Sequence, residues 1–313
     1  MRLRIDGPVV HLQAALCTGS RRLRTLLTDP TKDRRLALML ANAGYAYTLM
    51  AETMCEATIA VGDKIYSPKE LADLAIPRFE EAMQVATAAG SSATDVLNLA
   101  RSGLARAALL SGDKAKVMSA AAQVPSNFVW WVEYKEQIVT NTMNARVTGA
   151  NHALGVHPHF LTGTFGTQDL VATQTDPRIQ HTTRWSTGHN ALTKLYKPYQ
   201  SLPYSGYNGQ IIADGGKPIL YEQGTDIKLA SYADVMHNYY EAAGPNGTGP
   251  LGTTLDFVNS RRAFGHQAPV NLSGADLMTE PRPFSCDGQG PRLGPTGSLR
   301  ARPRLLAHPD VSP

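Results

Sequence analysis

The sequence has few of the features that mark redox-active, membrane-spanning or nucleic-acid-binding proteins. It contains 3 cysteines in 313 residues, and Cys17, Cys55 and Cys286 match no CxxC metal or redox spacing. No apolar run approaches the ~20 residues that a membrane-spanning helix needs. The 30 basic and 26 acidic residues are spread along the chain, so there is no basic stripe for a phosphate backbone. We therefore expect no nucleic-acid partner and no membrane-spanning helix, while the redox compartment stays open.

Motifs for nucleophilic and phosphate chemistry are missing as well. The chain has no GxSxG sequence, the turn that presents a nucleophilic serine. Gly216-Lys217 is followed by Pro218, which has neither a hydroxyl for magnesium nor a backbone N–H for a phosphate. Glu80 and Glu81 occupy successive helix positions and point apart, so they make a poor pair of general acid and base. The sequence therefore offers no motif for a nucleophilic serine or a phosphate-binding loop.

The 9 histidines leave a metal site as an alternative. His157 and His159 can place two imidazoles on one side of an extended segment, and His152, His181 and His189 lie in the same region. A catalytic zinc also needs a third ligand and an open position for water. Because no carboxylate stands at a spacing that completes the set, we predict no metal and no cofactor. A metal-dependent hydrolase is kept as an alternative.

The first helical hairpin is expected within the first 90 residues. Apolar residues at steps of three and four over 36–59 predict a long helix. Ser67 can cap a second helix over 68–90, with Glu70 as an early acid in its first turn. Pro77 removes one backbone donor inside this helix and should kink or split it.

A second hairpin follows directly. Thr94 or Asp95 can cap a helix that runs to Leu110, and a Gly-Asp turn leads into another helix that ends before Pro125. The two hairpins also share a pattern, because NAGYAYTL at 42–49 superposes on RSGLARAA at 101–108. Small residues such as those at these positions let helix backbones approach closely. The pattern is that of a tetratricopeptide-type helical repeat, with an irregular period.

The remainder of the chain is divided between loops and a few helices. After Phe128 the chain is rich in Gly, Pro, Thr, Asn and aromatic residues to about residue 225, and only 210–213 and 218–221 resemble strands. Helices are expected over 226–243 and 254–265. A long irregular segment of this kind usually forms a functional surface.

Aromatic rings beside polar residues make this loop region the candidate ligand-binding surface. Exposed rings stack on the apolar faces of sugars or grip a protein partner, and amide and hydroxyl groups orient the ligand. Some of these rings are expected to pack the loops onto the helices instead. The candidate ligand-binding residues are Trp130, Trp131, Trp185, Tyr199, Tyr204, Tyr207 and Asn208.

The two ends of the chain differ from the middle. The start has positive residues, a short apolar run and Cys17, a weak likeness to a lipoprotein signal that Asp6 and His11 interrupt. From Pro281 the tail is rich in proline and arginine without apolar periodicity. This abrupt change of composition suggests a change of reading frame near Glu280.

The order of the segments resembles that of the SusD/RagB family, outer-membrane-tethered nutrient-binding lipoproteins of Bacteroidota and related bacteria. The matching stretches are ANAGYAYTLMAETMCEATI, ELADLAIPRFEEAMQVATAAG, LARSGLARAALLSGDKAKVMSAAAQVP, DIKLASYADVMHNYYEAA and TLDFVNSRRAFG. Together they cover about residues 31–280. The chain departs from the family in lacking an evident lipoprotein signal and in its sequence after DLMTE.

The resemblance implies a mainly α fold, in which tetratricopeptide-like helical hairpins support a long irregular loop-rich insertion. It implies binding of oligosaccharide or peptide nutrients at the bacterial outer membrane, without catalysis, as partner of a TonB-dependent transporter. An intracellular tetratricopeptide-type adaptor is the alternative that the hairpins alone permit. The expected divisions are an N-terminal segment at 1–30 that reads as truncated, a SusD-like domain at 31–280 and an atypical tail at 281–313. Within the SusD-like domain we expect the hairpins at 36–125, the loop-rich binding region at 126–225 and the C-terminal helices at 226–280.

Overall fold

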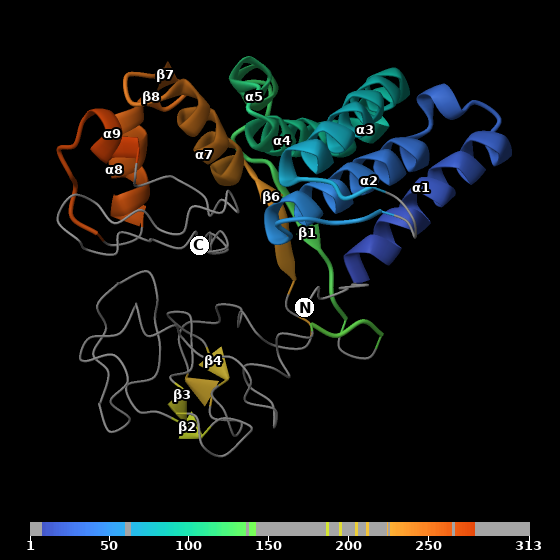
Figure 1. Ribbon diagram of the computed structural model, residues 1–313, viewed down its shortest axis with the longest axis horizontal. Helices are drawn as coiled ribbons and strands as arrows, with labels where there is room; N and C mark the ends of the chain where they lie inside the picture. Colours follow the sequence, from blue (N-terminus) through green and yellow to red (C-terminus); the bar gives the residue numbers. More distant parts are fainter. Residues whose placement is uncertain are drawn as a thin grey trace. The chain divides into compact units, whose positions relative to one another are not determined.

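The computed structural model describes residues 8–59, 64–135, 138–141, 224, 226–264 and 267–278, together with four two-residue strands between residues 186 and 212. Figure 1 labels the helices and strands along the chain. The chain divides into two units. The first, here the helical unit, comprises residues 1–130, 230–258 and 271–310. The second unit comprises residues 131–229, 259–270 and 311–313. The described residues are mainly helical, which confirms the predicted α class.

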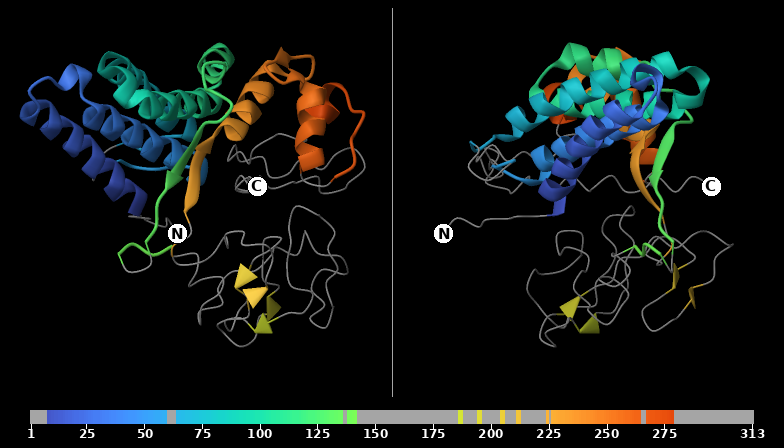
Figure 2. Two further views of the ribbon diagram at one scale, coloured as in Figure 1. Left: turned by 180° about the vertical axis from the view of Figure 1, so that it is seen from behind. Right: turned by 90° about the vertical axis from the view of Figure 1, so that its right-hand side faces the viewer.

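The helical unit begins with a helix that the sequence patterns did not reveal. Helix α1 spans Pro8–Leu26 and packs along α2, Arg34–Thr53. Cys17 is buried in this contact, with its sulfur 3.9 Å from the Tyr47 hydroxyl. Near the end of α1, Arg24 forms an ion pair with Glu81 of α3, which spans Pro68–Ala89. Figure 2 shows α1 and α2 side by side from two further directions. Helix α1 therefore forms part of the helical packing.

Helix α2 is shorter than the sequence predicts. It is capped by Asp33, whose side chain accepts a hydrogen bond from the backbone N–H of Arg35 at 2.8 Å. It ends at Thr53, so the predicted continuation to residue 59 is wrong. The reason is a competing backbone contact, because Ala57 and Tyr66 form an antiparallel bridge in the loop that follows. Their backbone groups are therefore not available to a longer helix.

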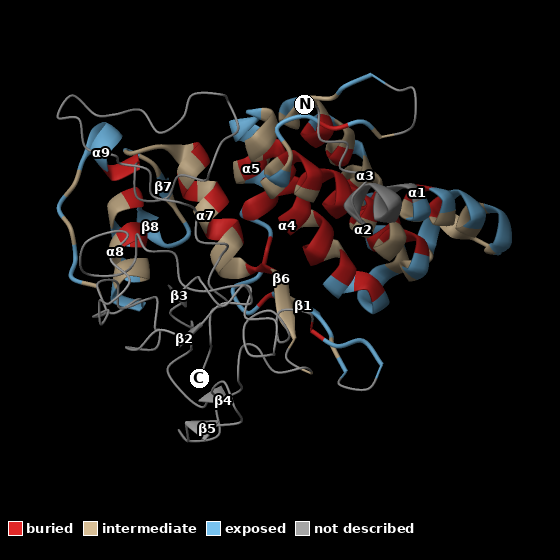
Figure 3. Cartoon of the chain, turned by 60° about the horizontal axis from the view of Figure 1, so that its bottom comes forward, coloured by how far each residue is buried: buried red, intermediate tan, exposed pale blue. Residues whose placement is uncertain are grey.

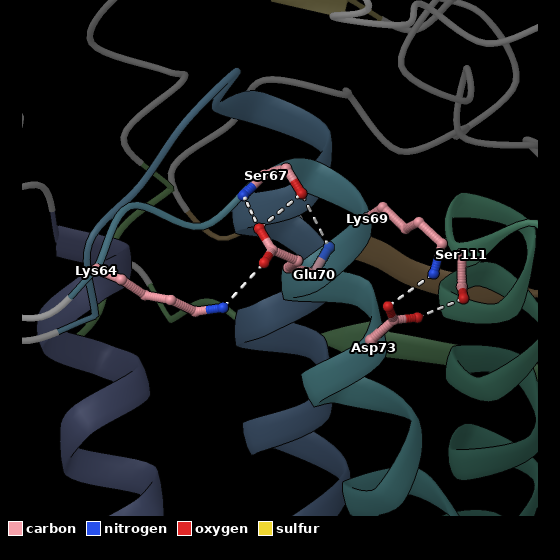
Figure 4. Close-up of polar contacts among 6 residues, drawn as sticks. All are labelled: Lys64, Ser67, Lys69, Glu70, Asp73 and Ser111. Carbon is pink, nitrogen blue, oxygen red and sulfur yellow. Dashed lines mark hydrogen bonds and ion pairs between the residues drawn. The ribbon is translucent and has the colours of Figure 1, made fainter.

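Helix α3, Pro68–Ala89, begins as the sequence predicts. The Ser67 hydroxyl accepts from the backbone N–H of Glu70 at 3.3 Å, and the Glu70 carboxylate accepts from the backbone N–H of Ser67 at 2.8 Å. This reciprocal capping box is shown in Figure 4. The helix runs unbroken through Pro77, so the split considered for this position does not occur.

The second hairpin has the predicted order with different caps. A 3₁₀ segment, η2 at Gly90–Ala93, leads into α4 at Thr94–Ser111, where no side chain caps the first turn. Ala93 is the N-cap, so neither Thr94 nor Asp95 occupies that position. The Asp95 carboxylate accepts from the backbone N–H of Val96 at 2.8 Å and from Arg34 Nη2 at 2.5 Å. Gly112 turns the chain with a φ of 90°, and Asp113 caps α5, Lys114–Ala121.

The core between the hairpins is organised around the ring of Phe79, which is fully buried. Figure 3 shows the buried residues that gather along α2 and α4. A Cβ added to Gly44 of α2 would lie 2.7 Å from this ring, and one added to Gly103 of α4 would lie 2.2 Å from it. The Tyr45 ring meets Phe79 edge-on, with centroids 5.2 Å apart. The close packing expected at Gly103 is confirmed, and the glycines of the two superposed segments face the same side chain.

The chain returns to the helical unit through a strand where a helix was predicted. Residues Ile227–Ser231 form β6, which pairs with β1, Val129–Val132, and α7 begins only at Tyr232 and ends at Ala243. Ser231 caps α7, which explains where the helix starts. The predicted helical start at residue 226 is therefore wrong, because long-range pairing with β1 determines the backbone there.

The remaining described elements are short. Strands β7, Thr248–Gly249, and β8, Gly252–Thr253, form a hairpin before α8, Thr254–Phe264, which matches the predicted helix over 254–265. Helix α9 spans Gly274–Met278.

Two further small strand pairs lie within the loop-rich region. Strand β2, Ser186–Thr187, pairs with β3, Lys194–Leu195, and β4, Tyr204–Ser205, pairs with β5, Ile211–Ile212. Strand β5 lies within the predicted strand-like piece 210–213. The piece at 218–221 and the tail from residue 281 lie outside the described residues.

Candidate ligand-binding site

Two of the predicted ligand-binding residues, Trp130 and Trp131, have described side chains, and both lie on β1. Trp130 is half-buried, whereas Trp131 is 44% exposed. Successive side chains of a strand point to opposite faces, which accounts for their different environments. Tyr204 lies in β4. The other predicted residues, Trp185, Tyr199, Tyr207 and Asn208, lie outside the described residues, so the structure does not test whether they join Trp131.

The strand that pairs with β1 supplies charged groups beside Trp131. Lys228 of β6 places its Nζ over the indole ring, 5.4 Å from the ring centroid. A cation at this distance is attracted to the negative face of the ring. Asp226, just before β6, accepts a hydrogen bond from the backbone N–H of Tyr134 at 2.8 Å. We refer to Trp131, Tyr134, Asp226 and Lys228 as the Trp131 site, and all four belong to the second unit.

Further apolar side chains are exposed shortly after β1. Ile138 is 77% exposed and Val139 is 57% exposed. They lie in a tight turn, in which the backbone N–H of Lys135 donates to the carbonyl of Val139 at 2.9 Å. The backbone N–H groups of Ile138 and Val139 in turn donate to the carbonyl of Lys135, each at 3.0 Å. An exposed indole ring beside an ammonium, as at Trp131 and Lys228, can bind a ligand with both apolar and polar faces.

The helical unit contains a polar cluster that sequence reasoning missed. Arg106 of α4 donates from Nε and Nη2 to the two carboxylate oxygens of Glu52 on α2, at 2.5 and 2.6 Å. Their side chains are 23% and 14% exposed, respectively. Burial acts to lower the pKa of Arg106, but the Glu52 charge outweighs it and the pKa is raised. No local motif signals this pair, because its members lie on different helices.

The same cluster includes a buried tyrosine. The Tyr45 hydroxyl donates to the carbonyl of Leu99 at 3.3 Å, and burial raises the pKa of Tyr45 above its ordinary range. Each charge in the Glu52–Arg106 pair meets its counter-charge with good geometry. The cluster therefore joins α2 to α4.

The described residues show few features of other kinds of site. A shallow depression of about 590 Å³ lies along α3 and is lined by Glu80, Met83, Gln84, Thr87 and Ala88. Within the part of the chain that the structure describes, no three His, Cys, Asp or Glu side chains gather as metal ligands. The histidines at 152, 157, 159, 181 and 189 lie outside that part. None of the described helices is both long and apolar enough to span a membrane.

Comparison with known proteins leaves the resemblance to SusD/RagB as a prediction. No family model, curated protein or solved structure matches the chain.

Proposed function

We propose that this protein binds oligosaccharide or peptide ligands without catalysing a reaction, and that the Trp131 site forms part of the binding surface. The observation that supports this proposal is the 44% exposure of the Trp131 ring beside the ammonium of Lys228. Large aromatic side chains are usually buried, so a ring that is held in solvent is a candidate contact for a ligand. The helical hairpins serve as the scaffold.

The exposed area of the Trp131 ring gives the expected loss of binding affinity when this ring is removed. A tryptophan side chain has roughly 250 Å² of accessible surface, so an exposure of 44% leaves about 110 Å² to be covered. At about 25 cal/mol per Å², covering this area contributes about 2–3 kcal/mol to binding. Replacing Trp131 by alanine should therefore weaken binding by about 30- to 150-fold if the ligand covers the whole exposed face.

The cellular role rests on the family resemblance. The order of the segments over 31–280 supports a tetratricopeptide-like scaffold, as does the packing of Gly44 and Gly103 against Phe79. We propose that the protein acts at the bacterial outer membrane as partner of a TonB-dependent transporter. An intracellular adaptor would bind its partner on the helices, so its binding would not depend on Trp131.

The test is binding to arrays of glycans and peptides, followed by titration of each hit with purified protein. The variants are Trp131→Ala, Trp131→Phe, which keeps an aromatic ring, and the matched control Val132→Ala on the same strand. We expect binding to be lost in Trp131→Ala, partly retained in Trp131→Phe and unchanged in the control. Circular dichroism checks that each variant is folded.

Two outcomes would contradict the proposal. One is the absence of binding to any glycan or peptide on the arrays. The other is equal affinity of the wild type and folded Trp131→Ala for every hit.

A variant that combines Trp130→Phe with Trp185→Phe leaves Trp131 as the single tryptophan of the chain. Its fluorescence can then be followed during the titration, so ligand contact with the Trp131 ring is observed directly.

A further inference from the structure

Arg101, on α4 in the helical unit, keeps hydrogen-bonding groups that no described residue fills. Its Nη1 donates to the side-chain oxygen of Asn98 at 3.1 Å and to the backbone carbonyl of Gln123 at 3.3 Å. Its Nε is buried and has no hydrogen-bond partner. A guanidinium has five N–H donors, so these two contacts leave most of its donors unused.

Arg106, five residues further along α4, is an arginine whose guanidinium is paired with a carboxylate, and it provides a comparison for Arg101. Its guanidinium forms two short, parallel hydrogen bonds to the carboxylate of Glu52. Arg101 instead meets one amide oxygen and one carbonyl oxygen, and none of the described carboxylates pairs with it. Its positive charge is therefore partly removed from water without a counter-charge.

The surroundings of Arg101 disfavour its uncompensated positive charge. Asn98 is buried, and burial lowers the pKa of Arg101 because it disfavours the charged form. Gln123 lies just after α5, where the carbonyls at a helix end carry only a partial negative charge. A structural role in holding this end of α5 accounts for one Nη1 contact. It does not account for the buried Nε without a partner, since such groups are normally satisfied by protein, water or an ion.

We propose that Arg101 is an oxyanion-binding site, which takes a carboxylate or phosphate group through Nη2. Nε is closed to solvent in this structure, and it becomes the second donor of the fork when the side chain shifts toward the bound ligand. Planar carboxylates and phosphates match this geometry, and the bound oxyanion supplies the negative charge that Arg101 lacks. The inference goes beyond the proposed function because none of its residues belongs to the Trp131 site. The two sites can therefore be tested separately.

The test is titration of the purified protein with inorganic phosphate and, in a separate arm, with sodium acetate, at constant ionic strength. Thermal unfolding and the ¹H–¹⁵N signal of the Arg101 Nε group are followed. The variants are Arg101→Gln and Arg101→Lys, which keeps the charge and loses the fork. Arg78→Gln on α3 is the matched control, because it removes another half-buried arginine of the same unit.

With phosphate or acetate at ten times its dissociation constant, we expect the unfolding midpoint to rise by about 3 °C in the wild type and in Arg78→Gln. Arg101→Gln should show no rise and Arg101→Lys a smaller one. Saturation in the phosphate arm alone assigns a phosphate ligand, and saturation in the acetate arm alone assigns a carboxylate. The wild-type Nε signal keeps the test valid if Arg101→Gln does not fold. An Nε signal that stays unmoved up to 20 mM of both anions, or an equal rise in Arg101→Gln, would overturn the proposal.

Discussion

The contact between Gly103 and Phe79 supports a quantitative prediction about the helical core. In a helix interior, replacing glycine by alanine normally stabilises a protein by about 1 kcal/mol. At Gly103 the new Cβ would lie 2.2 Å from Cε1 of Phe79, far inside the ordinary carbon contact of about 3.5–4.0 Å. Phe79 has little room to yield, because Gly44 and Tyr45 meet the same ring from α2.

The expected net effect of Gly103→Ala is a loss of about 2 kcal/mol in the free energy of unfolding. Overpacking of a dense core costs about 1–3 kcal/mol, occasionally more, and the gain in helix propensity offsets part of that cost. Urea unfolding followed by circular dichroism measures the change. We expect a lower midpoint with an unchanged m-value, since the fold and the surface exposed on unfolding remain similar.

The chain provides a matched control for this substitution. Gly19 also lies in a helix interior, but a Cβ there would approach the flexible end of Met39 at 3.3 Å. Gly19→Ala should therefore be neutral or stabilising by up to about 1 kcal/mol. Combining Gly103→Ala with Phe79→Leu should recover part of the loss, because the smaller side chain relieves the clash. The argument fails if Gly103→Ala is as stable as the wild type, or if both glycine variants lose the same stability.

Two further predictions concern charged residues of the helical unit. Glu52→Gln should lower the free energy of unfolding in urea by about 2–3 kcal/mol, which is less than the ~3–5 kcal/mol of a fully buried pair because Arg106 keeps some exposure. Lys69→Ala, in an exposed pair with Asp73, should change this free energy by less than about 0.5 kcal/mol. Equal effects of the two substitutions would contradict this view. The backbone N–H of Ser67, then Lys64, lowers the pKa of Glu70 to about 2. This stabilisation is complete above about pH 5 and is lost as the pH falls toward 2, so Glu70→Gln should flatten the fall in stability over that range. An unchanged slope would refute the assignment.

Local patterns predicted the elements whose ends depend on neighbouring residues. The start of α3 is an example, because Ser67 and Glu70 bond to each other across one helical turn. The close approach at Gly103 was also predicted, since a glycine among alanines in a helix indicates close packing. The residues that determine the start of α3 lie within one helical turn of each other. Gly103 is recognised because it is the single glycine among the alanines of its helix.

Contacts between distant residues explain what the sequence did not predict. Residues 227–231 read as part of a helix, but pairing with β1 makes them a strand. The Glu52–Arg106 pair joins two helices and has no sequence motif. At the candidate site, the aromatic residues could be identified from the sequence. The difference between half-buried Trp130 and exposed Trp131 depends on the strand and its surroundings.

The distribution of satisfied and unsatisfied groups points to where function should be sought. Glu52 and Arg106 satisfy each other, and Gly44 and Gly103 are required for packing against Phe79, so these residues are explained by the fold. Packing and hydrogen bonding do not explain the exposed ring of Trp131 or the unfilled donors of Arg101. Because they belong to different units, Trp131→Ala should leave anion binding unchanged and Arg101→Gln should leave glycan or peptide binding unchanged. Loss of both activities in either folded variant would mean that the two residues serve a single ligand.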